Sequence, residues 1–234
     1  KAGFLRACRK VKPGVKELEL EAEFAREFIR RGATFAYNPI IASGPNACVL
    51  HYIQNDQTCR AGQLLLLDVA AAYANYNSDL TRTLPVSGRF TRRQRRIYDA
   101  VLRVLRAAAK AAVPGKLPKQ WQKDAEALMQ EELLSLGLLK PAEVRRQNPE
   151  KPALKKYFMH GIGHPLGLDV HDVAITTEPI QPGWVLTVEP GIYLREEGLA
   201  VRLENNFLIG ENGNVDLMAD IPIEADEIED LMAR

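Results

Sequence analysis

Apolar residues spaced by four positions mark the first predicted helix of the chain. Within residues 16–32 they recur at Leu20, Phe24 and Phe28, and the segment ends at Gly32. This spacing places the three side chains on one helical face, and a glycine is common just past the end of a helix. The pattern therefore predicts an amphipathic helix over residues 16–32, with one face turned toward a core.

Two further helices are predicted in the middle of the chain. Residues 91–112 start at Thr91, whose side chain can cap the first turn, and they stop before a Pro-Gly pair. Residues 119–136 predict the next helix, and a polar, proline-containing loop over residues 141–156 follows it. This part of the chain should therefore supply two long helices joined by a tight turn.

The strand predictions rest on alternation and on short apolar runs. Residues 77–84 alternate in period two, which is typical of a half-buried strand. The remaining predicted strands are 46–53, 63–70, 157–164, 184–189, and a pair at 199–209 and 214–218. Helices and hairpins occur in both halves of the chain without a flexible linker between them. We therefore expect one α+β domain made of two related halves.

Four acidic residues interrupt segments that otherwise have the pattern of buried strands. They are Asp68, Asp79, Glu189 and Glu204. A buried carboxylate without a partner costs roughly several kcal/mol or changes its pKa. Any one of the four could lie on a solvated strand face, but that explanation is poor for all four together. The pattern indicates a shared positive partner.

The first two acids are predicted to lie opposite each other. If residues 64–84 form a hairpin with a tight turn near residues 73–74, Asp68 and Asp79 are cross-strand neighbours. Like charges directly opposite each other destabilise a sheet. A cation bound between the two carboxylates would remove that repulsion.

Three of the four histidines are concentrated in HGIGHPLGLDVHD, residues 160–172. Two glycines lie between His160 and His164, and the glutamate of a helical zinc motif is missing, so an extended segment fits better than a helix. In an extended segment the two imidazoles share one face. The proline and glycine that follow can bend the chain and return His171 to the same region. A single histidine is more often structural than a ligand, but this cluster accompanies buried acids.

The acids and one imidazole form a ligand set for two divalent cations. The four carboxylates would balance the charge of the ions, and His164 would be a neutral ligand. Oxygen-rich ligation with one imidazole favours Mn²⁺, with Co²⁺, Fe²⁺ and Zn²⁺ as alternatives. Arg202 shares a strand face with Glu204 and could orient its carboxylate. Two ions about 3.5–4 Å apart can acidify a shared water and polarise a carbonyl, which predicts a hydrolase.

Composition and charge exclude several other classes of protein. The net charge of the 234 residues is +1, so nucleic acid is not an expected partner, and TRRQRR at 91–96 is interpreted as a solvated helix turn. No apolar run reaches the roughly 20 residues that span a membrane. Cys8, Cys48 and Cys59 form no CxxC motif, which favours a reducing, cytoplasmic location. Because the chain starts at Lys1 rather than Met, we expect a missing upstream part.

Four sequence motifs together resemble those of the pita-bread metallopeptidases. They are HGIGHPLGLDVHD, LTVEPGIY, VRLEN and the acid pair in LLLLDVAAAYANYNSDLTRTLPVSG. Within that family, nearly all of the chain resembles the catalytic domain of Xaa-Pro aminopeptidases. The resemblance implies a curved, mostly antiparallel sheet with helices on its outer face and two pseudo-symmetric halves. It also implies that residues 1–234 form a single catalytic domain, without the smaller N-terminal domain of the family.

The resemblance assigns a role to each predicted metal ligand. Asp68 would chelate one ion, Asp79 and Glu204 would bridge both, and His164 and Glu189 would complete the second site. A hydroxide bridging the two ions would attack the peptide bond before a proline. The implied substrate is therefore a peptide with proline at its second position.

Further residues are assigned to catalysis and substrate binding by the same resemblance. Glu189 would be the proton shuttle, and His171 would hydrogen-bond the scissile peptide and stabilise its tetrahedral intermediate. The remaining residues of the substrate pocket would be His51, His160, Tyr193 and Arg202, and His160 would also assist catalysis. From the residues alone, His51, His160 and Tyr193 are equally compatible with packing roles. A role in the site is better supported for Arg202, because it shares a strand face with Glu204.

Two alternative functions stay open at this point. A prolidase-type Xaa-Pro dipeptidase has a similar His-Pro-Leu-Gly-Leu motif, but it usually carries a long insertion between the positions of His164 and Glu189. A non-catalytic pita-bread module that binds a partner is the other alternative, and the five retained ligands argue against it. Self-association into a homo-oligomer also stays open, because the N-terminal domain of relatives often contributes to it.

Overall fold

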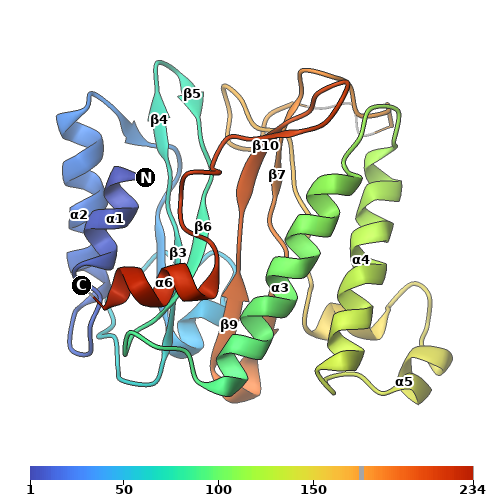
Figure 1. Ribbon diagram of the computed structural model, residues 1–234, viewed down its shortest axis with the longest axis horizontal. Helices are drawn as coiled ribbons and strands as arrows, with labels where there is room; N and C mark the ends of the chain where they lie inside the picture. Colours follow the sequence, from blue (N-terminus) through green and yellow to red (C-terminus); the bar gives the residue numbers. More distant parts are fainter. Residues whose placement is uncertain (174–176, 234) are drawn as a thin grey trace.

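The computed structural model describes residues 1–173 and 177–233. Short strands occupy the middle of the molecule, and helices flank them on both sides (Figure 1). The helices are α1 (Ala2–Cys8), α2 (Glu17–Arg30), α3 (Arg92–Ala111), α4 (Pro118–Ser135), α5 (Pro141–Arg146) and α6 (Ala225–Met232). The 3₁₀ helices are η1 (Gly44–Cys48), η2 (Ala153–Lys156) and η3 (Arg195–Glu197).

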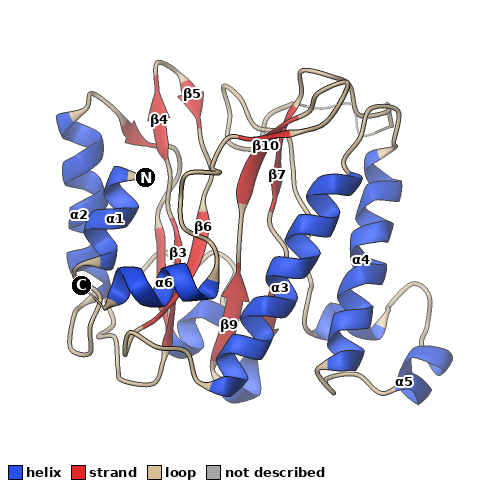
Figure 2. Cartoon of the chain, viewed as in Figure 1, coloured by secondary structure: helices blue, strands red, loops and turns tan. Residues whose placement is uncertain are grey.

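The strands form small sheets in which every described pair is antiparallel. They are β1 (Thr34–Phe35), β2 (Ile40–Ser43), β3 (Leu64–Asp68), β4 (Ala71–Tyr73), β5 (Tyr76–Asn77), β6 (Thr81–Pro85), β7 (Val185–Val188), β8 (Gly191–Leu194), β9 (Leu199–Arg202), β10 (Asn205–Leu208) and β11 (Val215–Asp216). The sheet orders are β1-β4-β5, β2-β3-β6, β11-β10-β7 and β8-β9. Figure 2 shows this mixture of strands and peripheral helices, which confirms the predicted α+β class.

Strand β3 explains how an apolar run can end on an acid. Its sequence is LLLLD, all five residues are buried, and β2 and β6 pair with its two edges. A strand covered on both faces needs apolar side chains at every position rather than alternation. The strand therefore carries its final carboxylate, Asp68, into the interior of the molecule.

The three helices predicted from periodicity are confirmed with small shifts at their ends. Helix α2 buries Leu20 and Phe24 on one face, as the spacing of four residues requires. Helix α3 begins at the predicted N-cap, where Thr91 Oγ1 accepts a hydrogen bond from the backbone N–H of Gln94. The side chain of Gln94 reaches back to the N–H of Thr91, so both ends of a capping box are made.

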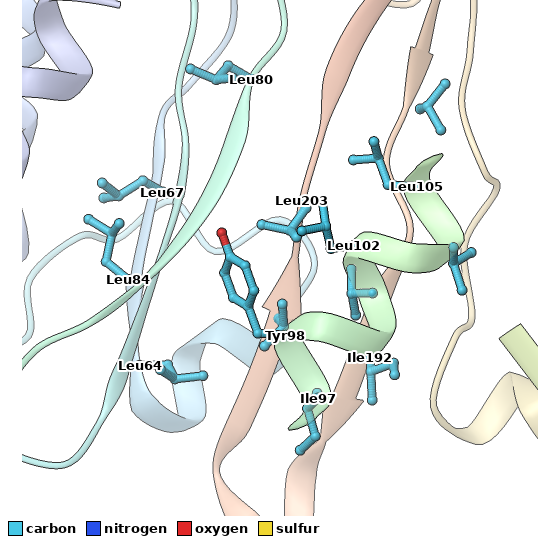
Figure 3. Packing of buried hydrophobic residues seen from close by; sticks show 14 of the residues in the cluster. Leu64, Leu67, Leu80, Leu84, Ile97, Tyr98, Leu102, Leu105, Ile192 and Leu203 are labelled. Atoms are coloured by element: carbon cyan, nitrogen blue, oxygen red, sulfur yellow. The ribbon is translucent and has the colours of Figure 1, made fainter. Parts of the chain in front are cut away.

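Helix α3 packs against strands from both halves of the chain. Figure 3 shows Tyr98 and Leu102 of α3 beside Leu203 of the second half, with Leu84 of the first half nearby. The hydroxyl of Tyr98 donates a hydrogen bond to the carbonyl of Ile223 at 2.8 Å. Each such buried leucine contributes roughly 1.5–3 kcal/mol. The shared core holds the two groups of strands in a fixed relation.

Two predicted strands are wrong, and glycine and proline are the physical reason in both. Residues 46–53 contain the end of η1 and then irregular chain, because Gly44 has a positive φ of 56° and Pro45 follows it. Residues 157–164 form no strand: Gly161 and Gly163 interrupt them, and single hydrogen bonds link them to neighbours. The predicted loop at 141–156 contains α5 and η2.

The predicted hairpin exists, but its turn lies one residue later. Ala74 and Asn75 have positive φ angles of 50° and 66°, as a two-residue hairpin turn requires, and Asn tolerates this conformation well. The register therefore pairs Asp68 with Thr81 rather than with Asp79. Asp79 lies in the short connection before β6, two residues before the observed partner of Asp68.

Several short elements lie outside the predictions. They are α1, α6, β1, β2 and β8, of which the helix α6 crosses the strands near the C-terminus (Figure 1). Strands of two to four residues and helices of seven or eight residues contain too little periodicity for a pattern to identify. Within the described ranges no helix has both the length and the apolar character needed to cross a membrane.

Candidate metal centre

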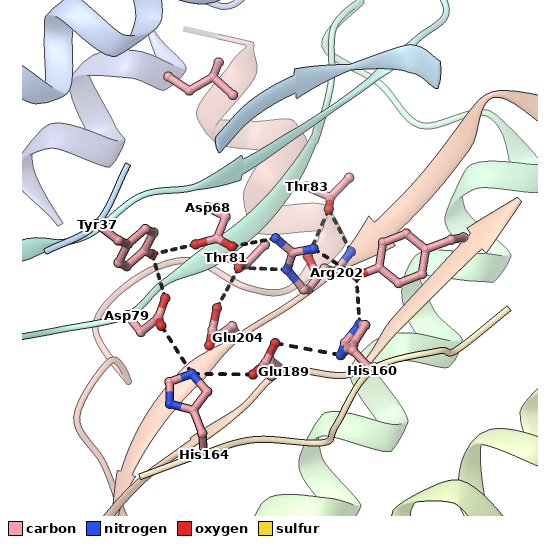
Figure 4. A network of polar contacts seen from close by, with 12 residues as sticks. Tyr37, Asp68, Asp79, Thr81, Thr83, His160, His164, Glu189, Arg202 and Glu204 are labelled. Carbon is pink, nitrogen blue, oxygen red and sulfur yellow. Dashed lines mark hydrogen bonds and ion pairs between the residues drawn. The ribbon is translucent and has the colours of Figure 1, made fainter. Parts of the chain in front are cut away.

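A cavity of about 380 Å³ lies between the two halves of the chain and gathers the predicted site residues. All of them except Tyr193 line it: His51, Asp68, Asp79, His160, His164, His171, Glu189, Arg202 and Glu204. Figure 4 shows the acidic side chains and imidazoles converging from different segments. Residues that are more than a hundred positions apart in the chain therefore share one small space.

The four acids reach this space because each one lies at or just beyond the end of a strand. Asp68 is the last residue of β3, and Asp79 lies two residues before β6. Glu189 follows β7 directly, and Glu204 lies in the short connection between β9 and β10. Strand ends allow a charged side chain to leave the apolar sheet without breaking its packing.

Three side chains form the tightest group of possible metal ligands. Each of Asp79, His164 and Glu204 offers one ligand atom, and these three atoms lie within 4.8 Å of one another. Atoms that each lie about 2.0–2.2 Å from one ion are separated by roughly 3–4.4 Å, so this spacing is close to a coordination shell. His164 Nε2 is also 3.6 Å from both Asp79 Oδ2 and Glu189 Oε1. The centre therefore contains one imidazole surrounded by carboxylates.

The imidazole of His164 is held in one orientation. Its Nδ1 lies 2.9 Å from the carbonyl oxygen of Pro165, so Nδ1 carries the proton and donates it. In the neutral ring, Nε2 then directs its lone pair toward the carboxylates, as a metal ligand requires. Burial alone lowers the pKa of His164, but contact with Asp79 and the charge of Glu189 together raise it.

Burial and mutual repulsion disfavour the charged forms of the carboxylates. Burial raises the pKa of Glu204 well above its usual range, and the charges of Asp79 and Glu189 add to that shift. Burial likewise raises the pKa of Glu189 to about 7, although Arg202 and His164 oppose the increase. A divalent cation would reverse this effect, because it stabilises the charged form of every carboxylate around it.

Asp68 differs from the other acids because both of its oxygens already have partners. Arg202 Nη2 donates to Asp68 Oδ2 at 2.5 Å, and the hydroxyl of Tyr37 contacts Oδ1 at 2.5 Å. The same hydroxyl lies 2.6 Å from Asp79 Oδ1. A phenol has only one proton to donate, so it can satisfy only one of these two carboxylates at a time. One of the two carboxylates is therefore left without a hydrogen from Tyr37.

Arg202, which was predicted to orient the carboxylate of Glu204, reaches that carboxylate only indirectly. The guanidinium binds Asp68 directly, and it reaches Glu204 only through Thr81, whose hydroxyl accepts from Arg202 Nε at 3.3 Å. That hydroxyl then donates to Glu204 Oε2 at 2.6 Å. The reason is the hairpin register, which places Thr81 directly opposite Asp68 and therefore between the two groups.

A chain of hydrogen bonds fixes His160 next to the acids. Arg202 Nη1 donates to the hydroxyl of Tyr193 at 2.9 Å, and that hydroxyl lies 2.8 Å from His160 Nε2. His160 Nδ1 lies 2.8 Å from the carbonyl oxygen of Gly161 and 3.8 Å from Glu189 Oε2. Burial lowers the pKa of His160 to about 3, so the ring is neutral. Tyr193 is itself buried behind the cavity wall rather than in it.

The other two histidines lie at the more open side of the cavity. The ring of His171 is 4.3 Å from that of His164 between centroids, and the two rings are nearly perpendicular. The bend after His164 therefore returns His171 to the cluster as predicted. Burial lowers the pKa of His171. His51 is exposed on irregular chain and still lines the cavity.

Sequence reasoning missed Tyr37 and Thr81, which both contact predicted ligands. Tyr37 lies in an irregular segment, and no spacing in the sequence links it to Asp68 or Asp79. Thr81 had a usable signal, because it continues the period-two alternation two residues after Asp79. A polar residue on the same strand face as a buried acid is a candidate hydrogen-bond donor to it.

The residues present fit divalent metal ions. Four carboxylates share the cavity with the imidazole of His164, and the guanidinium of Arg202 contacts one of them, Asp68. Hard oxygen donors with one nitrogen are suited to Mn²⁺ and related ions, and a thiolate is not required. The raised pKa values show that the side chains alone do not stabilise the negative charge they bring together.

The fold and this ligand set together define a metallopeptidase. The chain belongs to metallopeptidase family M24, whose model matches residues 1–211. The family assignment and the structural likeness described below confirm the predicted pita-bread fold and the resemblance to its metallopeptidases. A metallopeptidase of this family acts with divalent metal, and the cluster of Asp79, His164 and Glu204 is a candidate for holding it.

Within this family the chain is similar to Xaa-Pro aminopeptidases. It is 40% identical to the Escherichia coli Xaa-Pro aminopeptidase over 97% of its own length and 54% of that protein. It is also 40% identical to the Haemophilus influenzae Xaa-Pro aminopeptidase, of which it covers 56%. A zinc-substituted E. coli aminopeptidase P in complex with product superimposes with a TM-score of 0.91 at 39% identity, covering 99% of this chain and 55% of that one. The chain thus spans about half the length of these relatives.

Proposed function

We propose that this chain hydrolyses the peptide bond between an N-terminal residue and a proline at the second position, as a metal-dependent Xaa-Pro aminopeptidase. The observation that carries the proposal is the convergence of Asp79, His164 and Glu204 within 4.8 Å, beside Glu189. That convergence occurs in a chain with 40% identity to Xaa-Pro aminopeptidases.

Five residues would hold two divalent metal ions in this proposal. Asp68 would bind the first ion, Asp79 and Glu204 both ions, and His164 and Glu189 the second. Mn²⁺ suits this oxygen-rich set best, with Co²⁺, Fe²⁺ and Zn²⁺ as alternatives. When bound, the ions would supply an acidified water and a Lewis acid for the scissile carbonyl. Asp68 would exchange its contact with Tyr37 or Arg202 for one with an ion.

The chain's own residues would manage protons and orient the peptide. Glu189 would be the proton shuttle, because its carboxylate lies in the cavity between the imidazoles of His164 and His160. His171 lies beside His164 and can donate a hydrogen bond to the scissile peptide as a neutral imidazole. His160 is kept neutral and is oriented by Tyr193, so it can assist catalysis as a neutral group near Glu189.

The cavity walls are compatible with a small apolar ring next to the acids. Ile40, Leu50, Ile53 and Val170 line the cavity together with the acidic cluster. A proline ring is apolar, and its nitrogen in a peptide has no N–H to donate, so a wall of this kind suits it. The volume of about 380 Å³ matches the end of a short peptide rather than a folded protein.

The proposal is tested with EDTA-stripped protein reloaded separately with Mn²⁺, Co²⁺, Fe²⁺ or Zn²⁺. The substrates are an Xaa-Pro-Xaa tripeptide, an Xaa-Pro dipeptide and an Xaa-Ala-Xaa tripeptide. Cleavage of the first substrate alone, with at least one ion, is the expected result. Preference for the dipeptide would make the chain a prolidase-type enzyme. A chain that retains no ion and cleaves nothing would be a binding module.

Three further expectations belong to this proposal. Residues 1–234 would act as one catalytic domain, which the assay above measures directly. The buried free thiols of Cys8, Cys48 and Cys59 support a reducing, cytoplasmic environment. Assembly into a homo-oligomer would be measured by analytical ultracentrifugation, and no nucleic acid or membrane partner is proposed.

A further inference from the structure

One wall of the cavity is built from a segment that has no regular structure of its own. Leu50, His51 and Ile53 all line the cavity, yet residues 49–57 form neither helix nor strand. Without a ladder of backbone hydrogen bonds, such a segment needs side-chain contacts to keep one conformation. The position of His51 therefore depends on whatever anchors this stretch of chain.

A buried glutamate outside the metal centre provides that anchor. Glu17 is the first residue of α2 and is 0% exposed. Its Oε1 accepts hydrogen bonds from the backbone N–H and the hydroxyl of Ser43, both at 2.7 Å. Its Oε2 accepts from the hydroxyl of Tyr52 at 2.8 Å and from the backbone N–H of Gln57 at 3.0 Å. One carboxylate thus joins the end of β2 to the middle and to the C-terminal end of the segment that carries His51.

These four contacts require a carboxylate and not merely a polar side chain. All four partners of Glu17 are neutral donors, and among the described ion pairs none includes Glu17. An amide in the same place would accept at one oxygen only, and its NH₂ group would face two donors. The start of α2 adds a favourable partial positive charge. Within the described residues the carboxylate of Glu17 is thus held by neutral donors rather than by an ion pair.

A second tether lies next to the first and limits where the segment can move. The side-chain oxygen of Asn55 accepts from the N–H of Ile41, and its amide donates to Glu21 and to the carbonyl of Pro39, each at 2.9 Å. Asn55 has a positive φ of 49°, which Asn tolerates better than most residues. The base of the segment is therefore fastened to α2 and β2, while His51 at its tip stays exposed.

Tyr52 connects this anchor to the polar chain behind the cavity. Its ring packs in a small apolar cluster that also contains Tyr193, Ile40 and Leu66. Tyr193 in turn contacts His160 and Arg202. A change at Glu17 would thus be felt first in residues 49–57, and only indirectly at the metal ligands.

We propose that Glu17 is a positioning residue, which fixes residues 49–57 and thereby places His51 for binding the peptide substrate. The inference rests on the proposed aminopeptidase function for its kinetic consequence. It assigns Glu17 to substrate affinity rather than to metal binding or to the chemical step. Its contacts end at Ser43, Tyr52 and Gln57, so the ligand set is left intact.

The test is the isosteric variant Glu17→Gln, assayed as Mn²⁺-loaded protein on the Xaa-Pro-Xaa tripeptide. We expect KM to rise about tenfold, because one buried backbone donor loses its acceptor. The kcat and the metal content should stay near those of the unchanged protein. Glu131→Gln, at an exposed position of α4, is the matched control and should change neither constant. An unchanged KM, or a loss of kcat together with bound metal, would overturn the proposal.

A second measurement does not depend on activity. Amide hydrogen exchange should speed up at Ser43 or Gln57 in Glu17→Gln and stay unchanged in Glu131→Gln. Unchanged exchange at both amides would refute the anchor even if the enzyme assay failed for another reason. If the wild type cleaves no peptide while exchange responds as expected, the proposed function fails and the anchor stands. Should Glu17→Gln not fold, Tyr52→Phe removes one donor and should give the same KM-selective change on a smaller scale.

Discussion

Two regions of this protein bury carboxylates, and they differ in how the negative charge is stabilised. At the start of α2, Glu17 is completely enclosed but receives four hydrogen bonds from neutral donors. In the central cavity, Asp68, Asp79, Glu189 and Glu204 lie together, and burial raises the pKa of three of them. The chain itself supplies enough hydrogen-bond donors to the carboxylate of the first region, but not to the carboxylates of the second.

The difference shows what distinguishes a structural acid from a candidate metal ligand. Burial alone does not separate the two kinds of site, because Glu17 is as buried as Glu204. The separating feature is the ratio of donors to negative charges. Thr81 supplies Glu204 with a single hydroxyl donor, while burial and the charges of three other carboxylates raise the pKa of Glu204. Crowded acids with too few donors indicate a missing cation.

The largest expected effect comes from removing a ligand of the central cluster. Asp79→Ala should lower metal-dependent hydrolysis about a thousandfold or more, because Asp79 belongs to the tightest group of candidate ligands, together with His164 and Glu204. Metal content, measured by atomic emission, should fall with it. Asp230→Ala removes an exposed acid from α6 and serves as the control. Near wild-type turnover of Asp79→Ala would refute its assigned role.

The next effect separates a catalytic imidazole from a ligand. His171→Ala should reduce kcat about a hundredfold while the bound metal stays, since its proposed role is a hydrogen bond to the reacting peptide. His171→Gln retains a neutral donor and should recover part of the loss. If His171→Ala instead releases metal, His171 belongs to the coordination shell and the assignment is wrong.

Stability of the metal-free protein should depend on pH in an unusual direction. The pKa of Glu189 rises from 4.5 to about 7 on folding, so the folded state binds more protons between these values. Stability therefore decreases as pH rises from about 4.5 to about 7. The raised pKa of His164 acts in the same sense. Thermal unfolding in EDTA should show a midpoint that falls by several degrees over this range.

Adding Mn²⁺ should remove that dependence, because a bound ion favours the charged carboxylates. The Asp79→Ala variant serves as the comparison, since its weakened centre should respond little to the ion. A metal-free midpoint that rises between pH 4.5 and 7 would contradict the electrostatic account of the cavity.

The smallest predicted effect concerns the loop that carries His171. The side chain of Asn77 donates to the carbonyls of Gly167 and Leu168, at 3.2 and 2.7 Å. Asn77→Ala should lower kcat a few-fold by loosening this loop, with no change in metal content. Asn212→Ala, in an exposed turn, is the control. An effect as large as that of His171→Ala would mean that Asn77 does more than hold the loop.

The sequence could predict the long elements and the chemistry of the cavity, but not its exact connections. Periodicity located α2, α3 and α4, because each buries a continuous apolar stripe. Acids within apolar strands were identifiable because they are unfavourable there. The contacts of Arg202 and Tyr37 depend on a hairpin turn placed one residue later and on an irregular segment. Neither leaves a periodic trace in the sequence.

The same limit explains the two misplaced strands. Residues 46–53 and 157–164 contain strand-like apolar residues, but glycines within or beside them prevent a continuous ladder. Both segments nevertheless supply residues to the cavity. These functional residues thus lie in segments whose conformation is set by tertiary contacts rather than by local secondary-structure propensity.

The single hydroxyl of Tyr37 between two carboxylate oxygens has a consequence for ion uptake. Because the hydroxyl has one proton of its own, it cannot donate to both oxygens at once, and a second proton held by one of the carboxylates would complete the two contacts. Loading an ion would then expel that hydrogen into the solvent. Calorimetric titrations in buffers of different ionisation enthalpy would count it, and the apparent affinity for the ion would strengthen in alkaline solution.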